Sequence, residues 1–172
     1  NAKFYMGSVG MKRLEMVCDY INTVYSEHIL LVDGKDGDIG NTGSMALDYY
    51  VNVLHVDAIT ISPFMGYEDS SDMYLSNPDV ACFALCLTSN KGRKEFMTAK
   101  DSLKSPTFER IAEFAERDAD WNKNKNLHFV VGATNTVEEV TTIRRFAGED
   151  AIFLMPGLGA QGSAGEGQHR VG

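Results

Sequence analysis

Five short apolar runs recur along the chain and alternate with segments that mix apolar and polar residues. The runs are rich in β-branched residues and continuously apolar, which is typical of parallel strands buried on both faces. They cover residues 28–33, 56–62, 80–88, 127–133 and 151–156. A strand that alternates with a helix in this way predicts a parallel α/β protein.

Amphipathic helices are expected ahead of the first run and between the runs. The first apolar helix face consists of Met11, Leu14, Cys18, Ile21 and Tyr25. Similar spacing predicts helices over 46–53 and from residue 108. Thr136 and Glu139 have the spacing of a capping box, which predicts that a helix begins there.

The number of strands bears on the architecture. A (β/α)8 barrel uses about 250 residues, or roughly 31 for each strand and helix. With 172 residues and five strands, the chain is either a compact doubly wound sheet or an incomplete barrel. The start at Asn1 without Met and the polar end favour the incomplete barrel. The long gap after the third run holds a polar stretch, residues 90–104. We expect a solvated loop insertion there, with a basic loop that attracts phosphate as the alternative.

Charge and cysteine content narrow the class of protein. The formal net charge of −8 argues against non-specific nucleic-acid binding, which needs clustered Lys and Arg. It leaves a small anionic ligand possible, since a local pocket can oppose the global charge. Three cysteines without a CxxC spacing favour a reducing compartment. We therefore expect a cytoplasmic protein with no membrane span or signal peptide, and a targeting segment ahead of Asn1 stays an open alternative.

The stretch DGKDGDIGNT, residues 33–42, follows the first apolar run directly. EF-hand registers that begin at Asp33 or at Asp36 both fail, because the first places Lys35 and the second Gly40 at an oxygen-ligand position, so a calcium loop is not expected. A polar surface turn is one reading. In the other, Asp33 and Lys35 share a face at the carboxyl end of a buried strand, where α/β folds place their chemistry. With Asp38 in the following loop and Thr42 beyond it, such a cluster would keep Lys35 protonated for a developing negative charge.

A glycine-rich stretch follows the fifth run. Gly157, Gly159 and Gly162 satisfy GxGxxG, but no helix pattern or acidic residue follows at the spacing that a dinucleotide site needs. Exposed amides of such a loop suit a phosphate group. A loop without any ligand is the alternative.

Residues 33–42 match DxKxxDIxxT, which resembles the signature of the orotidine 5′-monophosphate decarboxylases of eukaryotic type, a group that includes the decarboxylase part of bifunctional UMP synthases. Further segments resemble the same family in the same order: NAKFYMGSVG (1–10), SPFMG (62–66), LTSN (87–90), FVVGAT (129–134) and PGLGAQG (156–162). The resemblance implies a TIM (β/α)8 barrel, of which the chain would hold strands three to seven. It also implies a single decarboxylase domain over 1–172, incomplete at both ends.

The resemblance further implies an activity and a set of site residues. Orotidine 5′-monophosphate would lose carbon dioxide to give uridine 5′-monophosphate in de novo pyrimidine biosynthesis, without metal or cofactor. Asp33, Lys35 and Asp38 would be catalytic, with Lys35 stabilising and protonating the ring carbanion. Asp38 and Thr42 would reach the neighbouring subunit's site in a homodimer, with no nucleic acid or membrane as partner.

Substrate binding is implied for residues of two other segments. Ser89 would read the pyrimidine edge, and the phosphate would be held by Gly159, Gln161 and Gly162. A second family lysine belongs ahead of Asn1, so we expect the chain to be a portion of a larger protein. Two alternatives stay open: a magnesium-dependent sugar-phosphate decarboxylase or synthase of the same superfamily, and a non-catalytic nucleotide-binding barrel.

Overall fold

The computed structural model describes residues 1–7, 10–100, 104–117 and 122–157. Its contacts gather into two compact units, Asn1–Cys82 and Phe83–Gly172. Each unit contains parallel strands joined through helices, which is the α/β class that the sequence predicts. Among the described residues, no helix is both long and apolar enough to cross a membrane.

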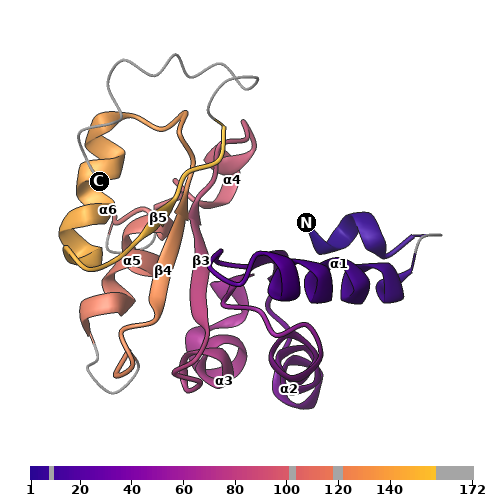
Figure 1. The fold of residues 1–172 in the computed structure, drawn as a ribbon. Coiled ribbons are helices and arrows are strands. Elements are labelled where there is room, and N and C mark those ends of the chain that lie inside the picture. Colours follow the sequence, from indigo (N-terminus) through magenta and orange to yellow (C-terminus); the bar gives the residue numbers. More distant parts are fainter. Residues whose placement is uncertain (8–9, 101–103, 118–121, 158–172) are drawn as a thin grey trace. The chain divides into compact units, whose positions relative to one another are not determined.

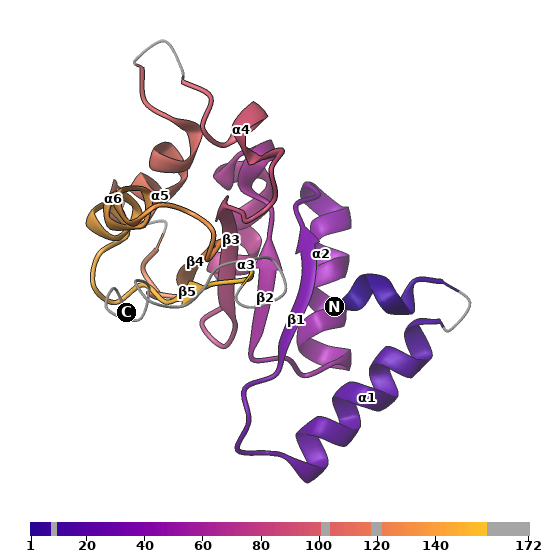
Figure 2. The same cartoon turned by 90° about the horizontal axis from the view of Figure 1, so that it is seen from above.

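The first unit contains one parallel strand pair. Its elements are η1 (Ala2–Tyr5), α1 (Met11–Val24), β1 (Leu31–Asp36), α2 (Gly40–Asp48), η2 (Tyr49–Val53), β2 (Ala58–Ile61), η3 (Pro63–Met65), η4 (Tyr67–Ser71) and α3 (Asp72–Leu75). β1 pairs with β2 in parallel, with Leu31 opposite Ala58. The π-helix η2 continues α2, α2 lies beside α3 (Figure 1), and η1 lies beside both α1 and β1 (Figure 2).

The second unit also contains a pair of parallel strands connected through a helix. Its elements are β3 (Ala81–Leu87), which begins at the end of the first unit, α4 (Arg93–Phe96), α5 (Thr107–Arg117), β4 (Leu127–Val131), α6 (Val137–Ala147) and β5 (Phe153–Leu154). β4 pairs with β5 in parallel, with Phe129 opposite Phe153. α5 packs against α6 (Figure 1), and the amide of Gly132 donates to Leu87 O (2.7 Å), so the ends of β4 and β3 lie together.

Burial explains why the runs are continuously apolar. Every residue of β2 and of β4 is buried. Because successive side chains of a strand point to opposite faces, both faces of each strand are covered. Ile59 and Ile61 are 1% and 0% exposed, and Phe129 is 0% exposed. Fully burying such a side chain is worth about 1.5–3 kcal/mol. The absence of an alternating polar face therefore follows from cover on both sides of the strand.

All five predicted strands are present, with shorter or shifted bounds. β2, β3, β4 and β5 lie inside their predicted runs. β1 differs, because it begins at Leu31 and continues to Asp36, through charged residues that the apolar pattern had placed beyond the strand. The capping box is confirmed, since Thr136 Oγ1 accepts from the Glu139 amide and the Glu139 side chain accepts from the Thr136 amide. The polar stretch 90–104 is not loop alone, since it contains α4.

The cysteines give a prediction for thiol chemistry. Cys18, Cys82 and Cys86 are all buried, and burial raises the pKa of each thiol, that of Cys82 to about 12. Because the thiolate is the reactive form, all three should resist iodoacetamide at pH 8 in the folded protein and react in denaturant. Mass-spectrometric peptide mapping after a short labelling pulse measures this. Rapid native labelling of Cys82 or Cys86 would contradict the described packing.

Candidate active site

Asp33 and Lys35 form a close charge pair at the end of β1. Lys35 Nζ donates to Asp33 Oδ1 at 2.5 Å and to Oδ2 at 2.6 Å. Thr60 Oγ1 also donates to Oδ1 (2.8 Å), and Asn1 Nδ2 donates to Oδ2 (2.7 Å). The two charged side chains are 28% and 43% exposed, so they are partly dry and still open to a ligand. The structure therefore brings together the two residues that the sequence pairs.

The Asp33 carboxyl is held in its charged form. Burial by itself would raise its pKa, but the hydrogen bonds from Lys35 and Thr60 and the charge of the ammonium outweigh burial and lower the pKa below its ordinary value. An opposite charge on a nearby donor favours the ionised carboxylate. Asp33 is thus a fixed negative charge, and Lys35 is the cation next to it.

A β-bulge, rather than simple alternation along a strand, makes this pair. The register between β1 and β2 shifts between Val32 and Asp36, and Lys35 has a φ of 56°, in the left-handed region. The Lys35 amide donates to Thr60 Oγ1 (2.9 Å) in place of a regular strand partner. A residue with a side chain costs about 1–2 kcal/mol in that region. Asp33 and Lys35 lie on the same side of the strand end, as the sequence predicts, and the bulge of β1 is a feature that strand alternation does not predict.

Two further residues contribute to this strand end, and sequence reasoning did not single them out. The Tyr50 hydroxyl donates to Asp36 Oδ2. Gly34 lies against that hydrogen bond, because a Cβ at Gly34 would meet both Asp36 Oδ2 and the Tyr50 hydroxyl. Asp36 lay in the charged motif, but Tyr50 lay within the apolar helical pattern of 46–53, where an aromatic residue indicates only core packing.

Asp38 and Thr42 lie farther along the chain, on an exposed part of the first unit. Asp38 precedes α2, and its Oδ1 accepts from the Ile39 amide (2.8 Å). Thr42 is exposed in the first turns of α2. Within the described part of the chain, the ion pair of Lys35 is with Asp33 and not with Asp38. The structure thus presents Asp38 and Thr42 outward.

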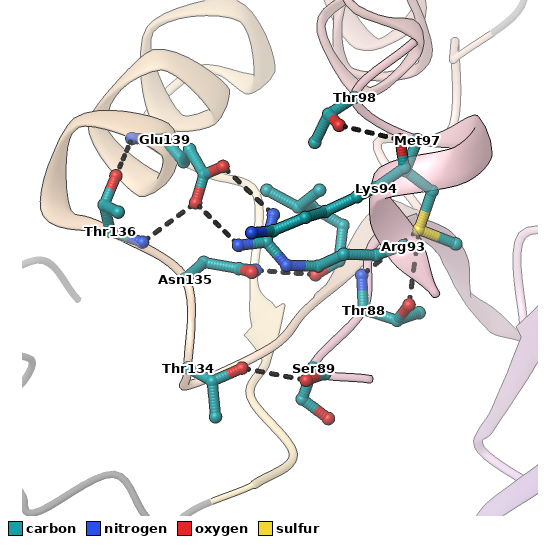
Figure 3. Close-up of polar contacts among 11 residues, drawn as sticks. Thr88, Ser89, Arg93, Lys94, Met97, Thr98, Thr134, Asn135, Thr136 and Glu139 are labelled. Atoms are coloured by element: carbon teal, nitrogen blue, oxygen red, sulfur yellow. Dashed lines mark hydrogen bonds and ion pairs between the residues drawn. The ribbon is translucent and has the colours of Figure 1, made fainter. Parts of the chain in front are cut away.

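In the second unit, Ser89 lies in the turn after β3. Thr134 Oγ1 donates to Ser89 O (3.0 Å), and Asn135 Nδ2 donates to Leu87 O (2.7 Å), as Figure 3 shows. Gly132 packs so closely under the turn that a Cβ there would meet the backbone of Ser89. Residues that follow β4 therefore hold the backbone of the Ser89 turn in place.

The far side of that turn is held by a charge pair. Arg93, at the start of α4, donates to both carboxylate oxygens of Glu139 (3.0 and 3.4 Å), as Figure 3 shows. Glu139 Oε2 also accepts from the Thr136 amide (2.9 Å) in the capping box of α6. The amide and hydroxyl of Thr88 donate to Met97 Sδ (3.4 and 3.3 Å). The turn is thus tied to both α4 and α6.

The glycine-rich stretch is described only at its beginning. Gly157 has a φ of 103°, which suits glycine, and it lies three residues beyond the end of β5. Three predicted phosphate-binding residues lie outside the described residues: Gly159, Gln161 and Gly162. In the described ranges, no three side chains of His, Cys, Asp or Glu are grouped so that they could hold a metal ion.

The sequence profile of the orotidine 5′-phosphate decarboxylase / HUMPS family matches residues 7–172. The chain belongs to this family. An orotidine 5′-phosphate decarboxylase of Porphyromonas gingivalis is 39% identical over 166 residues, which are 95% of this chain and 58% of that protein. The chain thus spans somewhat more than half the length of that curated relative.

Solved structures agree with the family assignment. The OMP decarboxylase of Leishmania donovani matches with a TM-score of 0.79 and 34% identity, over 90% of this chain and 59% of its own. The UMP synthase of the same organism matches with a TM-score of 0.84 and 36% identity, over 95% of this chain and 35% of its own. The predicted family and the predicted fold, part of a TIM barrel, are confirmed.

The Asp33–Lys35 pair gives a prediction for pH dependence. Replacement Lys35→Ala removes the charge and one hydrogen-bond donor, so burial should then raise the Asp33 pKa. With its lowered pKa, Asp33 stabilises the fold above the unfolded pKa, and this stabilisation is lost as the pH falls through the folded pKa. Carboxyl ¹³C NMR titration measures the shift, with the exposed Lys12→Ala as matched control. An equal Asp33 pKa in both variants would contradict the described pairing.

The Arg93–Glu139 pair gives a prediction for stability. The two side chains are 11% and 23% exposed, so Glu139→Ala should lower the free energy of unfolding by about 1.5–3 kcal/mol through lost hydrogen bonds to charged groups. Glu139→Gln should cost less, because an amide can still accept from the Thr136 amide. Urea unfolding measures both. Thr98→Ala, which removes an exposed hydroxyl bonded to Lys94 O, is the control and should cost under about 0.5 kcal/mol.

Proposed function

We propose that the protein carrying this chain converts orotidine 5′-monophosphate to uridine 5′-monophosphate and carbon dioxide. One observation carries the proposal: a lysine ammonium and an ionised aspartate held 2.5 Å apart at the carboxyl end of a parallel strand. In barrels of this kind the carboxyl ends of the strands form the active site. Relatives that carry the decarboxylase name support the choice of substrate.

The proposed decarboxylation depends first on a fixed positive charge beside the reacting carbon. Loss of carbon dioxide leaves an electron pair on the ring carbon, and the proposed reaction uses no metal or cofactor to delocalise it. Lys35 would stabilise this carbanion as it forms and then protonate it. Asp33 would lie beside the substrate carboxylate and repel it more strongly than it repels the neutral product. The role of Asp33 needs its ionised state, which the pairing with Lys35 favours.

Binding roles follow for groups away from the reacting carbon. Ser89, on its firmly held turn, would hydrogen-bond the pyrimidine edge. Gly159, Gln161 and Gly162 would hold the phosphate, as amides of a glycine-rich loop can. Binding energy from base and phosphate would offset the cost of bringing the substrate carboxylate near Asp33.

We also infer a homodimer, in which Asp38 and Thr42 complete the neighbouring subunit's site. Both residues face outward on the first unit. Two apolar side chains next to them in sequence, Ile39 and Met45, are 44% and 68% exposed. Exposed apolar side chains around outward polar groups suit a subunit interface.

The activity is tested by following the loss of orotate absorbance with the full-length protein. Lys35→Ala should lower kcat by at least about 10²–10³-fold, the usual cost of removing one group that stabilises a developing charge. Lys12→Ala, on the exposed face of α1, should leave kcat within about twofold.

Three outcomes would contradict the proposal. Near-normal turnover by Lys35→Ala would show that Lys35 is not the central cation. Turnover that a chelator abolishes, or that is seen with sugar phosphates and magnesium alone, would favour the magnesium-dependent branch that shares the family profile. Binding of uridine nucleotide without turnover would indicate a non-catalytic nucleotide-binding barrel.

A further inference from the structure

We propose that Asp36 and Tyr50 are positioning residues for Lys35. Their hydrogen bond fixes the bulge of β1 and thereby directs the Lys35 ammonium onto Asp33. The proposal deepens the proposed function and rests on it for its kinetic readout, whereas its structural readout is independent of substrate.

Lys35 needs such support because of its backbone conformation. With a φ of 56°, it lies in a region that residues with side chains leave unless their surroundings hold them there. On the amino side it is anchored through its own amide, which donates to Thr60 Oγ1 (2.9 Å). On the carboxyl side the next residue, Asp36, must be held equally firmly.

Asp36 is held at two atoms. Its carbonyl accepts from the Ser62 amide, which continues the pairing with β2 beyond the bulge. Its carboxylate accepts from the Tyr50 hydroxyl. The backbone bond fixes the height of Asp36 along β2, and the side-chain bond fixes its rotation about the strand. Together with the bond from the Lys35 amide to Thr60, these contacts set the direction in which the Lys35 side chain projects from the backbone.

Gly34 shows that the Asp36–Tyr50 bond lies directly against the strand. A Cβ at Gly34 would meet both Asp36 Oδ2 and the Tyr50 hydroxyl. Gly34 stands between the two residues of the charge pair, so the bond supports the strand at the centre of the Asp33–Lys35 segment. Glycine at this position makes room for the bond.

Tyr50 is suited to act as a constant donor. It is 5% exposed, and burial, followed by its bond to Asp36, raises its pKa well above the ordinary value. The phenol therefore keeps its proton at neutral pH and can donate to Asp36. The Tyr50 hydroxyl donates to Asp36 Oδ2, whereas the donors to Asp33 are Lys35, Thr60 and Asn1, so the two carboxylates have separate partners in these bonds.

The neighbouring residue supplies a matched control. Tyr49 also donates its hydroxyl to a carboxylate, that of Glu15 (3.1 Å), but Glu15 lies on α1. Tyr49→Phe and Tyr50→Phe therefore remove the same atom, from adjacent residues of η2, and each breaks a tyrosine–carboxylate bond. The difference is whether the carboxylate belongs to β1.

The experiment compares Tyr50→Phe, Asp36→Asn, the double variant and Tyr49→Phe in the full-length protein. Tyr50→Phe and Asp36→Asn should each lower kcat roughly ten- to hundredfold, as a misplaced catalytic group does, while KM for orotidine 5′-monophosphate stays within about twofold. The double variant should be no slower than the slower single variant, because both substitutions disrupt the same hydrogen bond. Tyr49→Phe should leave kcat within about twofold.

Thermal unfolding and a crystal structure of each variant complete the test. In Tyr50→Phe we expect Lys35 to leave its left-handed conformation and its Nζ to move away from Asp33, whereas Tyr49→Phe should keep both. Lower stability with unchanged kcat in folded Tyr50→Phe and Asp36→Asn would overturn the proposal, as would an unchanged Lys35 geometry. If the wild-type protein does not decarboxylate the substrate, the proposed function fails, and the crystal structures still decide the positioning role.

Discussion

The charge pair between Asp33 and Lys35 depends on a balance between burial and pairing. Burial alone would neutralise Asp33, but Lys35 and Thr60 donate to it and keep it ionised. Removing charges from water costs more than a single contact returns unless the remaining lone pairs are also bonded. Asn1 and Thr60 satisfy that condition on the two oxygens of Asp33. The contacts at this strand end hold the charges of Asp33 and Lys35 close together while both side chains stay partly exposed.

This requirement explains the irregular backbone of β1. A regular strand would also place Asp33 and Lys35 on one face, but it would not bring the Lys35 amide to the side chain of Thr60. The bulge instead transfers that amide to Thr60 Oγ1, so the hydroxyl of Thr60 bonds both the backbone of Lys35 and the carboxylate of Asp33. Local strain of this kind persists only where neighbours determine it, and it is concentrated at functional sites.

In the second unit, the Ser89 turn is held in place by contacts with regular strands and helices. The Ser89 turn carries no left-handed residue among its described neighbours in 88–92 and depends instead on β4, α4 and α6. Gly132, Thr134 and Asn135 hold its backbone on one side, and the Arg93–Glu139 pair ties α4 to the helix cap on the other. In the proposed function, where Ser89 binds the pyrimidine edge, such rigidity would favour binding because the donors of the turn need no rearrangement.

The sequence by itself determined the order of strands and helices, the α/β class and the pairing of Asp33 with Lys35. These features follow from local periodicity and from spacing within one short motif, both of which are properties of neighbouring residues. Only the tertiary structure decided the bulge and the roles of Thr60 and Tyr50. Thr60 lies 27 residues beyond Asp33, and Tyr50 lies 14 beyond Asp36, in segments whose pattern indicates core alone. Contacts between residues so far apart depend on how the chain folds back, which residue spacing does not encode.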